Sequence, residues 1–416
     1  MTVSEIPVRS IAEQLEQLSL INDDPSAGGI TREVFTATYM RASDVVAELM
    51  AQAGLSVRSD AFGNLLGRID GRDSAAAAVL SGSHIDTTLN AGAYDGVLGV
   101  LGAIEAVRAL RAIGWEPARS LEVVCFAGEE PRFGSGCLGS RALTGSLTRA
   151  ELDSMCDREG VSIAEAMRGI GLDPDRLEDA RLDTDAVHAF VELHIEQAGV
   201  LEAAGISIGA VTHIAAPHDL LVRITGAAAH AGATPMSLRR DAFAGAVEAA
   251  AELERLARSS PSRSTVATVG VVRVGPGAIN VIPGDVELQI DIRDHDLAAR
   301  AAVVEAFLDE LDRIVERRGL EVSVETITHD NPAVCSSVVV DAVRGACADV
   351  GEPFLDVISG AYHDAMILGA HVQIGMIFVP SVGGISHSPL EYTAPEDIDR
   401  GVRVLAATLR RLCEAA

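Results

Sequence analysis

The chain has 416 residues, which favours two domains over a single core, and a formal net charge of −27 from 33 basic and 60 acidic side chains. This balance argues against nucleic acid and anionic membrane surfaces as partners, because both are bound through a basic face. Six cysteines without a CxxC pair, and an N-terminus without a signal sequence, lead us to expect a reduced, cytoplasmic protein.

Apolar runs of strand length alternate with helical patterns in the first half of the chain and return near its end. Such alternation predicts an α/β sheet that helices cover on both faces. The expected elements are helices over 33–53 and 97–113 and strands over 76–81, 121–126, 189–193 and 374–379.

A middle segment, residues 214–328, follows a different order of elements. It predicts strand, helix, strand, strand, helix and strand, which is the order of a ferredoxin-like α+β sandwich. We therefore expect an inserted domain over 214–328 and a catalytic domain over 1–213 and 329–416. The inserted elements are expected over 220–225, 240–257, 265–274, 285–293, 297–317 and 320–326.

Side chains that bind metals follow four of the predicted strands. The carboxyl ends of strands in an open α/β sheet are where ligands bind, so we expect these side chains to meet. Asp95 precedes the 97–113 helix and can bridge two cations with its two oxygens. Imidazoles and carboxylates of this kind suit borderline metals such as Zn²⁺. The strand-end residues are His84, Asp86, Glu129, Glu130, His194 and His387.

The adjacent Glu129 and Glu130 predict a division of labour. On an irregular turn they point in different directions, so one can bind metal while the other takes the proton of an activated water. A single histidine after a strand, or a single Glu pair, is more often an ordinary hydrogen-bonded or solvated group. The combination at four strand ends favours a metal site.

Two motifs favour other classes of protein. Residues 134–139 match GxGxxG, which is typical of nucleotide-binding proteins, but Pro131 and the Glu pair separate them from the preceding strand. Residues 205–209 match the GxSxG elbow of serine hydrolases, but the chain continues there as a strand instead of a helix. Both alternatives are therefore weaker than the metal site.

Eight stretches resemble the M20-type metallopeptidase superfamily. Within it they are similar to amidohydrolases that include N-carbamoyl-L-amino-acid hydrolase, allantoate amidohydrolase and bacterial β-ureidopropionase. HIEQ, HAGATPM and GGISHSPLEY favour this branch over aminoacylases and dipeptidases of the same fold. The stretches are GSHIDT (82–87), AYDGVLGV (93–100), EEPRFGSGCLGSRAL (129–143), ELHIEQ (192–197), HAGATPM (230–236), DIRDHD (291–296), SGAYHDAM (359–366) and FVPSVGGISHSPLEYT (378–393).

The resemblance implies an enzyme that hydrolyses a carbamoyl or ureido C–N bond in a small carboxylate, with two divalent ions per subunit. It implies Zn²⁺ or Mn²⁺, with Co²⁺ as a further possibility. His84 and His194 would hold one ion, Glu130 and His387 the other, and Asp95 would bridge them. The implied fold is a zinc-peptidase-like catalytic domain with an inserted lid that also forms a homodimer.

The remaining roles also follow from the resemblance. Glu129 would be the general base, and Asp86 would orient His84. His230 would stabilise the oxyanion, from the partner subunit. Arg293 would bind the substrate carboxylate. The other implied substrate contacts are Gln197, Asn280, the Gly360 backbone and His363.

Two positions depart from the pattern of the resemblance. Pro131 follows the Glu pair where many relatives have glycine, and Tyr362 stands where many have glycine. Because Tyr362 is expected beside the carboxylate-binding group, it bears on which substrate the chain accepts.

Overall fold

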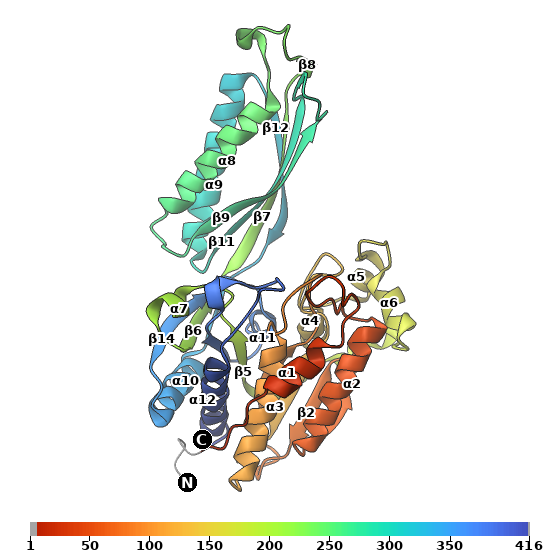
Figure 1. Ribbon diagram of the computed structural model, residues 1–416, viewed down its shortest axis with the longest axis vertical. Helices are drawn as coiled ribbons and strands as arrows, with labels where there is room; N and C mark the ends of the chain where they lie inside the picture. Colours follow the sequence, from red (N-terminus) through yellow and green to blue (C-terminus); the bar gives the residue numbers. More distant parts are fainter. Residues whose placement is uncertain (1–5, 415–416) are drawn as a thin grey trace. The chain divides into compact units, whose positions relative to one another are not determined.

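The computed structural model describes residues 6–414 and divides into two compact units. Unit 2 comprises His213–Ala333 and Ile358–Tyr362, and unit 1 comprises the rest (Figure 1). Residues 358–362 were expected in the catalytic domain. The structure groups this segment with unit 2, where Ala215 N–H donates to the Ser359 carbonyl and Arg293 donates to the Gly360 carbonyl.

Unit 1 is built on a nine-stranded sheet of order β1-β2-β4-β3-β5-β15-β6-β13, with β14 paired to β6. Its four central strands run parallel and are almost entirely buried, as in sheets covered on both faces. They are β4 (Leu121–Phe126), β3 (Ala78–His84), β5 (Val187–Ile195) and β15 (Ile374–Val379). The α/β class expected from the sequence is confirmed. The other strands are β1 (Ser56–Ser59), β2 (Leu65–Ile69), β6 (Ile208–Ile214), β13 (Ala333–Val334) and β14 (Phe354–Ser359).

Helix α3 (Val97–Ala112) lies deepest in unit 1 and packs on β3, β5 and α12 (Pro395–Glu414). Gly99 permits this contact, because a Cβ there would lie 2.3 Å from the Leu193 carbonyl oxygen. The other helices of unit 1 are α1 (Ala12–Ser19), α2 (Ala37–Gln52), α4 (Leu138–Thr144), α5 (Arg149–Ser154), α6 (Ile163–Gly169), α7 (Val200–Ala204), α10 (Ser337–Val350) and α11 (Asp364–Leu368), with 3₁₀ turns η2 (Pro174–Ala180), η3 (Thr184–Ala186) and η5 (Val382–Gly384).

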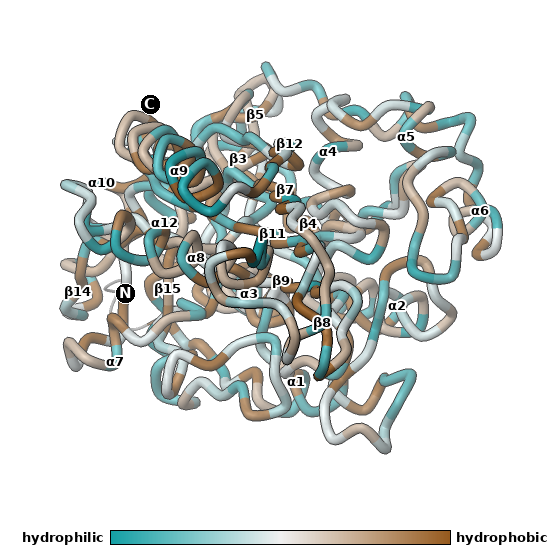
Figure 2. Tube along the Cα trace, turned by 90° about the horizontal axis from the view of Figure 1, so that it is seen from above, coloured by the Kyte–Doolittle hydropathy of each residue, from teal (hydrophilic) through white to brown (hydrophobic). Residues whose placement is uncertain are grey.

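Unit 2 is an antiparallel sheet of order β12-β7-β11-β9, with two helices side by side on one face (Figure 1). Alternate residues of β7 and β11 are buried against the helices, which is the pattern of a sheet with one covered face. Hydrophilic and hydrophobic residues alternate along the coils of α9 (Figure 2). The elements are β7 (Ala216–Thr225), β8 (Ala229–His230), η4 (Met236–Leu238), α8 (Ala242–Arg258), β9 (Val266–Gly275), β10 (Val281–Ile282), β11 (Asp285–Asp294), α9 (Leu297–Arg318) and β12 (Glu321–His329).

Neither rival motif has the local structure its class requires. Gly205 ends α7 and β6 begins at Ile208, so Ser207 follows a helix and precedes a strand, the reverse of a nucleophile elbow. Residues 127–137 separate β4 from α4, so the glycines of 134–139 do not directly follow a strand. Across residues 6–414, no helix has the length and apolarity needed to cross a bilayer.

Candidate functional site

The four central strands of unit 1 end at the same edge of the sheet. The parallel register pairs His84 with Phe126 and Ile195 with Val379, the last residues of neighbouring strands. This alignment brings the loops that follow β3, β4 and β15 next to His194 near the end of β5. The candidate metal ligands therefore converge on this edge from segments that are far apart in the sequence.

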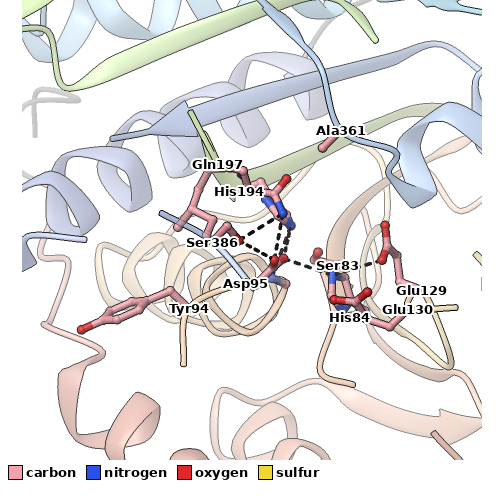
Figure 3. A network of polar contacts seen from close by, with 12 residues as sticks. Ser83, His84, Tyr94, Asp95, Glu129, Glu130, His194, Gln197, Ala361 and Ser386 are labelled. Carbon is pink, nitrogen blue, oxygen red and sulfur yellow. Dashed lines mark hydrogen bonds and ion pairs between the residues drawn. The ribbon is translucent and has the colours of Figure 1, made fainter. Parts of the chain in front are cut away.

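Asp95 lies at the centre of the cluster (Figure 3). Its Oδ1 atom is 3.2 Å from His194 Nε2 and 3.6 Å from His84 Nε2. Its Oδ2 atom is 3.1 Å from His387 Nε2, which in turn lies 3.4 Å from Glu130 Oε1. Each carboxylate oxygen of Asp95 thus faces a different set of imidazoles.

These separations fit two metal positions that share Asp95. Two ligands of a tetrahedral Zn²⁺ ion, each at about 2.0–2.1 Å from the metal, lie about 3.4 Å from each other. The observed separations are 3.2 and 3.6 Å around Oδ1 and 3.1 and 3.4 Å around Oδ2 and His387. His84, Asp95 and His194 form one donor set, and Asp95, Glu130 and His387 form the other.

The electrostatics of the cluster favour a cation. Burial alone would raise the pKa of Asp95, but hydrogen bonds from the three imidazoles lower it well below its usual range. Burial and the Asp95 carboxylate raise the pKa of Glu130 to about 7. The hydrogen bond to Asp95 raises the pKa of His387 to about 9. Burial and the neighbouring carboxylate thus both disfavour the charged form of Glu130, and a bound cation would favour it.

Two of the imidazoles are oriented by backbone carbonyl groups. His194 Nδ1 lies 2.9 Å from the Ile195 oxygen, and His84 Nδ1 lies 3.1 Å from the Asp86 backbone oxygen. Because a carbonyl only accepts, each Nδ1 carries a proton, which leaves each Nε2 as the ring nitrogen that could bind a metal ion.

The Asp86 carboxylate lies beside the His84 ring and also contacts the Glu129–Glu130 turn. Its Oδ1 atom is 3.7 Å from His84 Nδ1, an ion-pair distance, while the Asp86 backbone oxygen is the hydrogen-bond acceptor of that nitrogen at 3.1 Å. The carboxylate accepts the backbone N–H groups of Gly128, Glu129 and Glu130 at 2.9–3.3 Å. Asp86 therefore ties the His84 loop to the Glu129–Glu130 turn.

Glu129 belongs to neither donor set but lies beside both. Its Oε2 atom is 3.8 Å from His84 Nε2, and its side chain is 12% exposed. Burial and the neighbouring Glu130 carboxylate, opposed by His84, raise the pKa of Glu129 well above its usual range. Such a group can accept and hold a proton at neutral pH.

Gln197 adopts a left-handed backbone, with φ of 56°, and its side-chain amide lies against Asp95. Its Nε2 group donates to Asp95 Oδ2 at 2.8 Å and lies 3.3 Å from Ser386 Oγ. Its Oε1 atom is buried and has no hydrogen-bond partner among the described residues. Because Nε2 binds Asp95, Oε1 is the atom of this amide that is left to accept a further hydrogen bond.

His363 is buried beside the first donor set, with its ring edge-on to that of His194 at 4.6 Å between centroids. Burial and His194 lower the pKa of His363 well below its usual range, so the ring is neutral. Glu192, His194 and His363 also lie within reach of a single ion. His194 has no ring nitrogen left for that position, because Nδ1 binds a carbonyl and Nε2 faces Asp95.

Unit 2 places His230 and Asn280 together. His230 is exposed on β8, and the Ala231 N–H donates to the Asn280 carbonyl. The Nδ1 atom of His230 accepts the backbone N–H groups of Gly232 and Ala233 at 3.1 and 3.2 Å. The proton of the neutral ring is therefore on Nε2, which is available as a hydrogen-bond donor.

Some of the hydrogen-bond donors of the Arg293 guanidinium already have partners within unit 2. Its Nε and Nη2 groups bind the Asp291 carboxylate at 2.7–2.9 Å, and Nη1 donates to the Gly360 carbonyl at 3.0 Å. The edge formed by Nη1 and Nη2 retains donors for a further acceptor. Tyr362 turns its hydroxyl to Asp330 Oδ2, at 3.0 Å.

Several residues beside the candidate ligands were not predicted from the sequence, and two of them, Ser83 and Glu391, are buried. Ser83, next to His84 in the chain, donates to Glu192 at 2.6 Å, and Ser386 lies 2.9 Å from Asp95 Oδ2. Glu391 accepts the Tyr94 and Asp95 backbone N–H groups. The only signal in the sequence is the adjacency of Ser83 and Ser386 to ligand histidines.

Relatives of known activity are similar over nearly the whole chain. An N-carbamoyl-L-amino acid amidohydrolase of Geobacillus stearothermophilus is 44% identical over 97% of this chain and 98% of its own. A ureidoglycolate hydrolase of Arabidopsis thaliana is 42% identical over 97% of this chain and 86% of its own.

The fold also matches a solved structure. The amidase of the hydantoinase/carbamoylase family from Burkholderia multivorans superposes with a TM-score of 0.91 at 36% identity, covering 99% of this chain and 100% of its own. A sequence model of the peptidase family M20/M25/M40 matches residues 89–411, which include Asp95 and His387. The chain belongs to the peptidase family M20/M25/M40.

Proposed function

We propose that the chain is a two-metal amidohydrolase that cleaves the carbamoyl or ureido C–N bond of a small carboxylate, such as an N-carbamoyl-L-amino acid. The observation that carries this proposal is Asp95, whose two oxygens face two separate donor sets at ligand–ligand spacing. Divalent ions bound there, Zn²⁺, Mn²⁺ or Co²⁺, supply Lewis acidity that activates water and polarises the carbonyl. The names of the two relatives agree with this class of reaction.

The protein groups then carry the protons. Glu129 takes a proton from the attacking water and returns it to the leaving nitrogen, as its raised pKa allows. Water adds its oxygen to the carbamoyl carbon, and the bond from that carbon to the amino acid nitrogen breaks. The products are the free amino acid and carbamate, which decays to ammonia and carbon dioxide. His230, with a proton on Nε2, is the proposed donor to the oxyanion.

Gln197 supports a ureido substrate over an N-acyl one. Its Nε2 is committed to Asp95, so the unpartnered acceptor Oε1 is the group left for the substrate. A carbamoyl group has a terminal NH₂ that can donate to this oxygen, whereas an acetyl group has a methyl. Leaving a buried acceptor unpaired costs about 1–3 kcal/mol, which disfavours aminoacylase and dipeptidase activity.

The carboxylate end of the substrate is assigned to unit 2. Arg293 has free donors on its Nη1–Nη2 edge, and bidentate contact with a carboxylate suits a guanidinium. Asn280, the Gly360 backbone and His363 are proposed as further substrate contacts. Tyr362 lies two residues from Gly360 and is expected to limit the substituent that the substrate carries at this end.

Homodimer formation through unit 2 is part of the proposal. Strand β9 forms one edge of the four-stranded sheet and carries exposed Val266, Val272 and Val274. An open ten-residue strand with apolar side chains is a surface on which a second copy can pair. Light scattering at several concentrations tests this, since a monomer at all of them contradicts it.

The function is tested with a substrate panel after chelation. N-carbamoyl-L-amino acids, allantoate, β-ureidopropionate, ureidoglycolate and N-acetyl amino acids are assayed before and after adding Zn²⁺, Mn²⁺ or Co²⁺. We expect ureido substrates to be hydrolysed only with metal, and serine-directed reagents to have no effect. Ureidoglycolate is the second candidate substrate, because the Arabidopsis relative is 42% identical. Full activity in chelator, or preference for N-acetyl substrates, would contradict the proposal.

A further inference from the structure

Glu391 is a buried carboxylate in the loop between His387 and α12. Although the loop lies at the protein surface, Glu391 is 5% exposed. Its Oε1 atom accepts the backbone N–H groups of Tyr94 and Asp95 at 2.9 and 3.1 Å. Its Oε2 atom accepts the Ser386 hydroxyl at 2.8 Å and lies 3.3 Å from the His387 backbone nitrogen, which donates to it. One side chain thus joins two loops that are almost 300 residues apart.

The Glu391 carboxylate fills a space that its neighbours leave open. A Cβ on Gly92 would lie 2.2 Å from Glu391 Oε1 and 2.4 Å from its Cδ, so only glycine leaves room. On the other side, His387 adopts a left-handed backbone with φ of 53°. This conformation is uncommon for a residue with a side chain and persists where its surroundings enforce it.

We propose that Glu391 is a positioning residue that holds Asp95 and His387 at the spacing required for the second metal ion. The inference rests on the proposed two-metal function. Glu391 touches Asp95 and His387 only through their backbone N–H groups, so it sets where their side chains are and leaves both free to bind metal.

The contacts predict an unequal effect on the two ions. The Asp95 carboxylate is also held by Gln197 and by the imidazoles of the first donor set. His387 is 49% exposed, and Glu391 accepts its backbone N–H. The hydrogen bonds of the Glu391 carboxylate involve neither His84 nor His194. Loss of Glu391 should therefore weaken the ion held by His387 more than the other.

Ser386 extends the same contact. Its hydroxyl lies 2.8 Å from Glu391 Oε2 and 2.9 Å from Asp95 Oδ2, and it has one proton to donate. The carboxylate that does not receive this proton faces the Ser386 hydroxyl oxygen without a hydrogen between them. A cation near Asp95 Oδ2 favours donation to Glu391, which couples occupancy of the second site to the Glu391 contact.

The test measures metal affinity on the full chain by calorimetry with Zn²⁺ after chelation. For Glu391→Gln we expect the first ion to bind as in the wild type and the second about 10–100-fold more weakly, the usual cost of losing a partner that orients a ligand. At a fixed, low metal concentration, kcat of the variant should be lower than that of the wild type, while KM changes little. At higher metal concentrations kcat should recover. Asp294→Asn, a buried carboxylate of unit 2 with a similar set of donors, is the matched control and should bind both ions normally.

Gly92→Ala tests the same contact without changing residue 391. The new methyl group takes up the space of the carboxylate, so it should produce the same selective loss. Both variants are checked for folding by circular dichroism, and either folded variant is sufficient. Wild-type affinity for the second ion in a folded variant overturns the inference. A wild type that binds fewer than two ions overturns the proposed function instead.

Discussion

Replacing Glu129 with glutamine should separate metal binding from turnover. Glutamine has nearly the shape of glutamate but cannot take a proton from water. Glu129 lies outside both donor sets, and its backbone N–H contact with Asp86 at 3.3 Å does not depend on the side chain. The variant should therefore keep the turn, the ligands and both ions.

The size of the effect follows from the step that is lost. A positioned general base contributes about 10²- to 10⁴-fold to the rate. At about 1.4 kcal/mol per tenfold change, this corresponds to about 3–5 kcal/mol of transition-state stabilisation. As the proposed general base, Glu129 would act on the reacting atoms and bind little of the substrate, so the loss should fall on kcat with KM nearly unchanged. Because a buried, charge-repelled carboxylate is removed, the melting temperature of the metal-free chain should not fall.

The assay combines metal analysis with steady-state kinetics. Elemental analysis should find the wild-type metal content in Glu129→Gln, while ammonia release from an N-carbamoyl amino acid drops by the factor given above. Near-normal turnover would remove Glu129 from the role of base. Loss of metal together with turnover would show that Glu129 is a ligand, and the division of labour between the two glutamates would be wrong.

Three further variants test other parts of the site. Gly96→Ala should fold but lose metal, since a Cβ at φ of 64° would lie 2.4 Å from His84 Nε2; normal metal content would refute this. Mixing inactive His230→Ala and Glu129→Gln chains should restore about one quarter of the sites if His230 acts across a dimer, whereas no recovery would place it in its own subunit. Although burial opposes it, hydrogen bonds lower the pKa of Asp294 below 3.8. Asp294→Asn should therefore lose about 1–2 kcal/mol of unfolding free energy at pH 7, and the difference should shrink as the pH falls below 3.8; a constant difference in urea titrations would contradict the assignment.

The sequence predicted the fold class and the convergence of the candidate metal ligands because both follow from local patterns. Apolar runs marked the parallel strands, and the polar residues directly after them had to meet once the strands were aligned. The ends of β4 and β15 were predicted to the residue, while β3 and β12 extend three residues beyond the predicted ends, at His84 and His329. These extensions carry polar residues, which an apolar pattern does not include.

The contacts around the candidate ligands could not be predicted from the sequence, because they join residues that are far apart in the chain. Glu391 occurs in a loop, where a lone carboxylate is ordinarily solvated, and its burial depends on Gly92, which lies far away in the sequence. The Asp86 carboxylate was assigned to His84, which is near in sequence and lies 3.7 Å from it, but its hydrogen bonds to the Glu129 turn, which is near only in space, were not predicted. Segment 358–362 joins unit 2 through hydrogen bonds to Ala215 and Arg293 that no periodicity signals.

The wide sequence separation of His84 and His387 has a consequence for unfolding. Two metal ions bound through Asp95 would cross-link segments about 300 positions apart. If they stayed bound on unfolding, they would lower the conformational entropy of the unfolded chain. Because the folded chain binds metal far better than the unfolded chain, bound metal raises the free energy of unfolding and the melting temperature. The thermal midpoint should then rise with the logarithm of free metal concentration, so a melting curve reports occupancy even when no substrate is known.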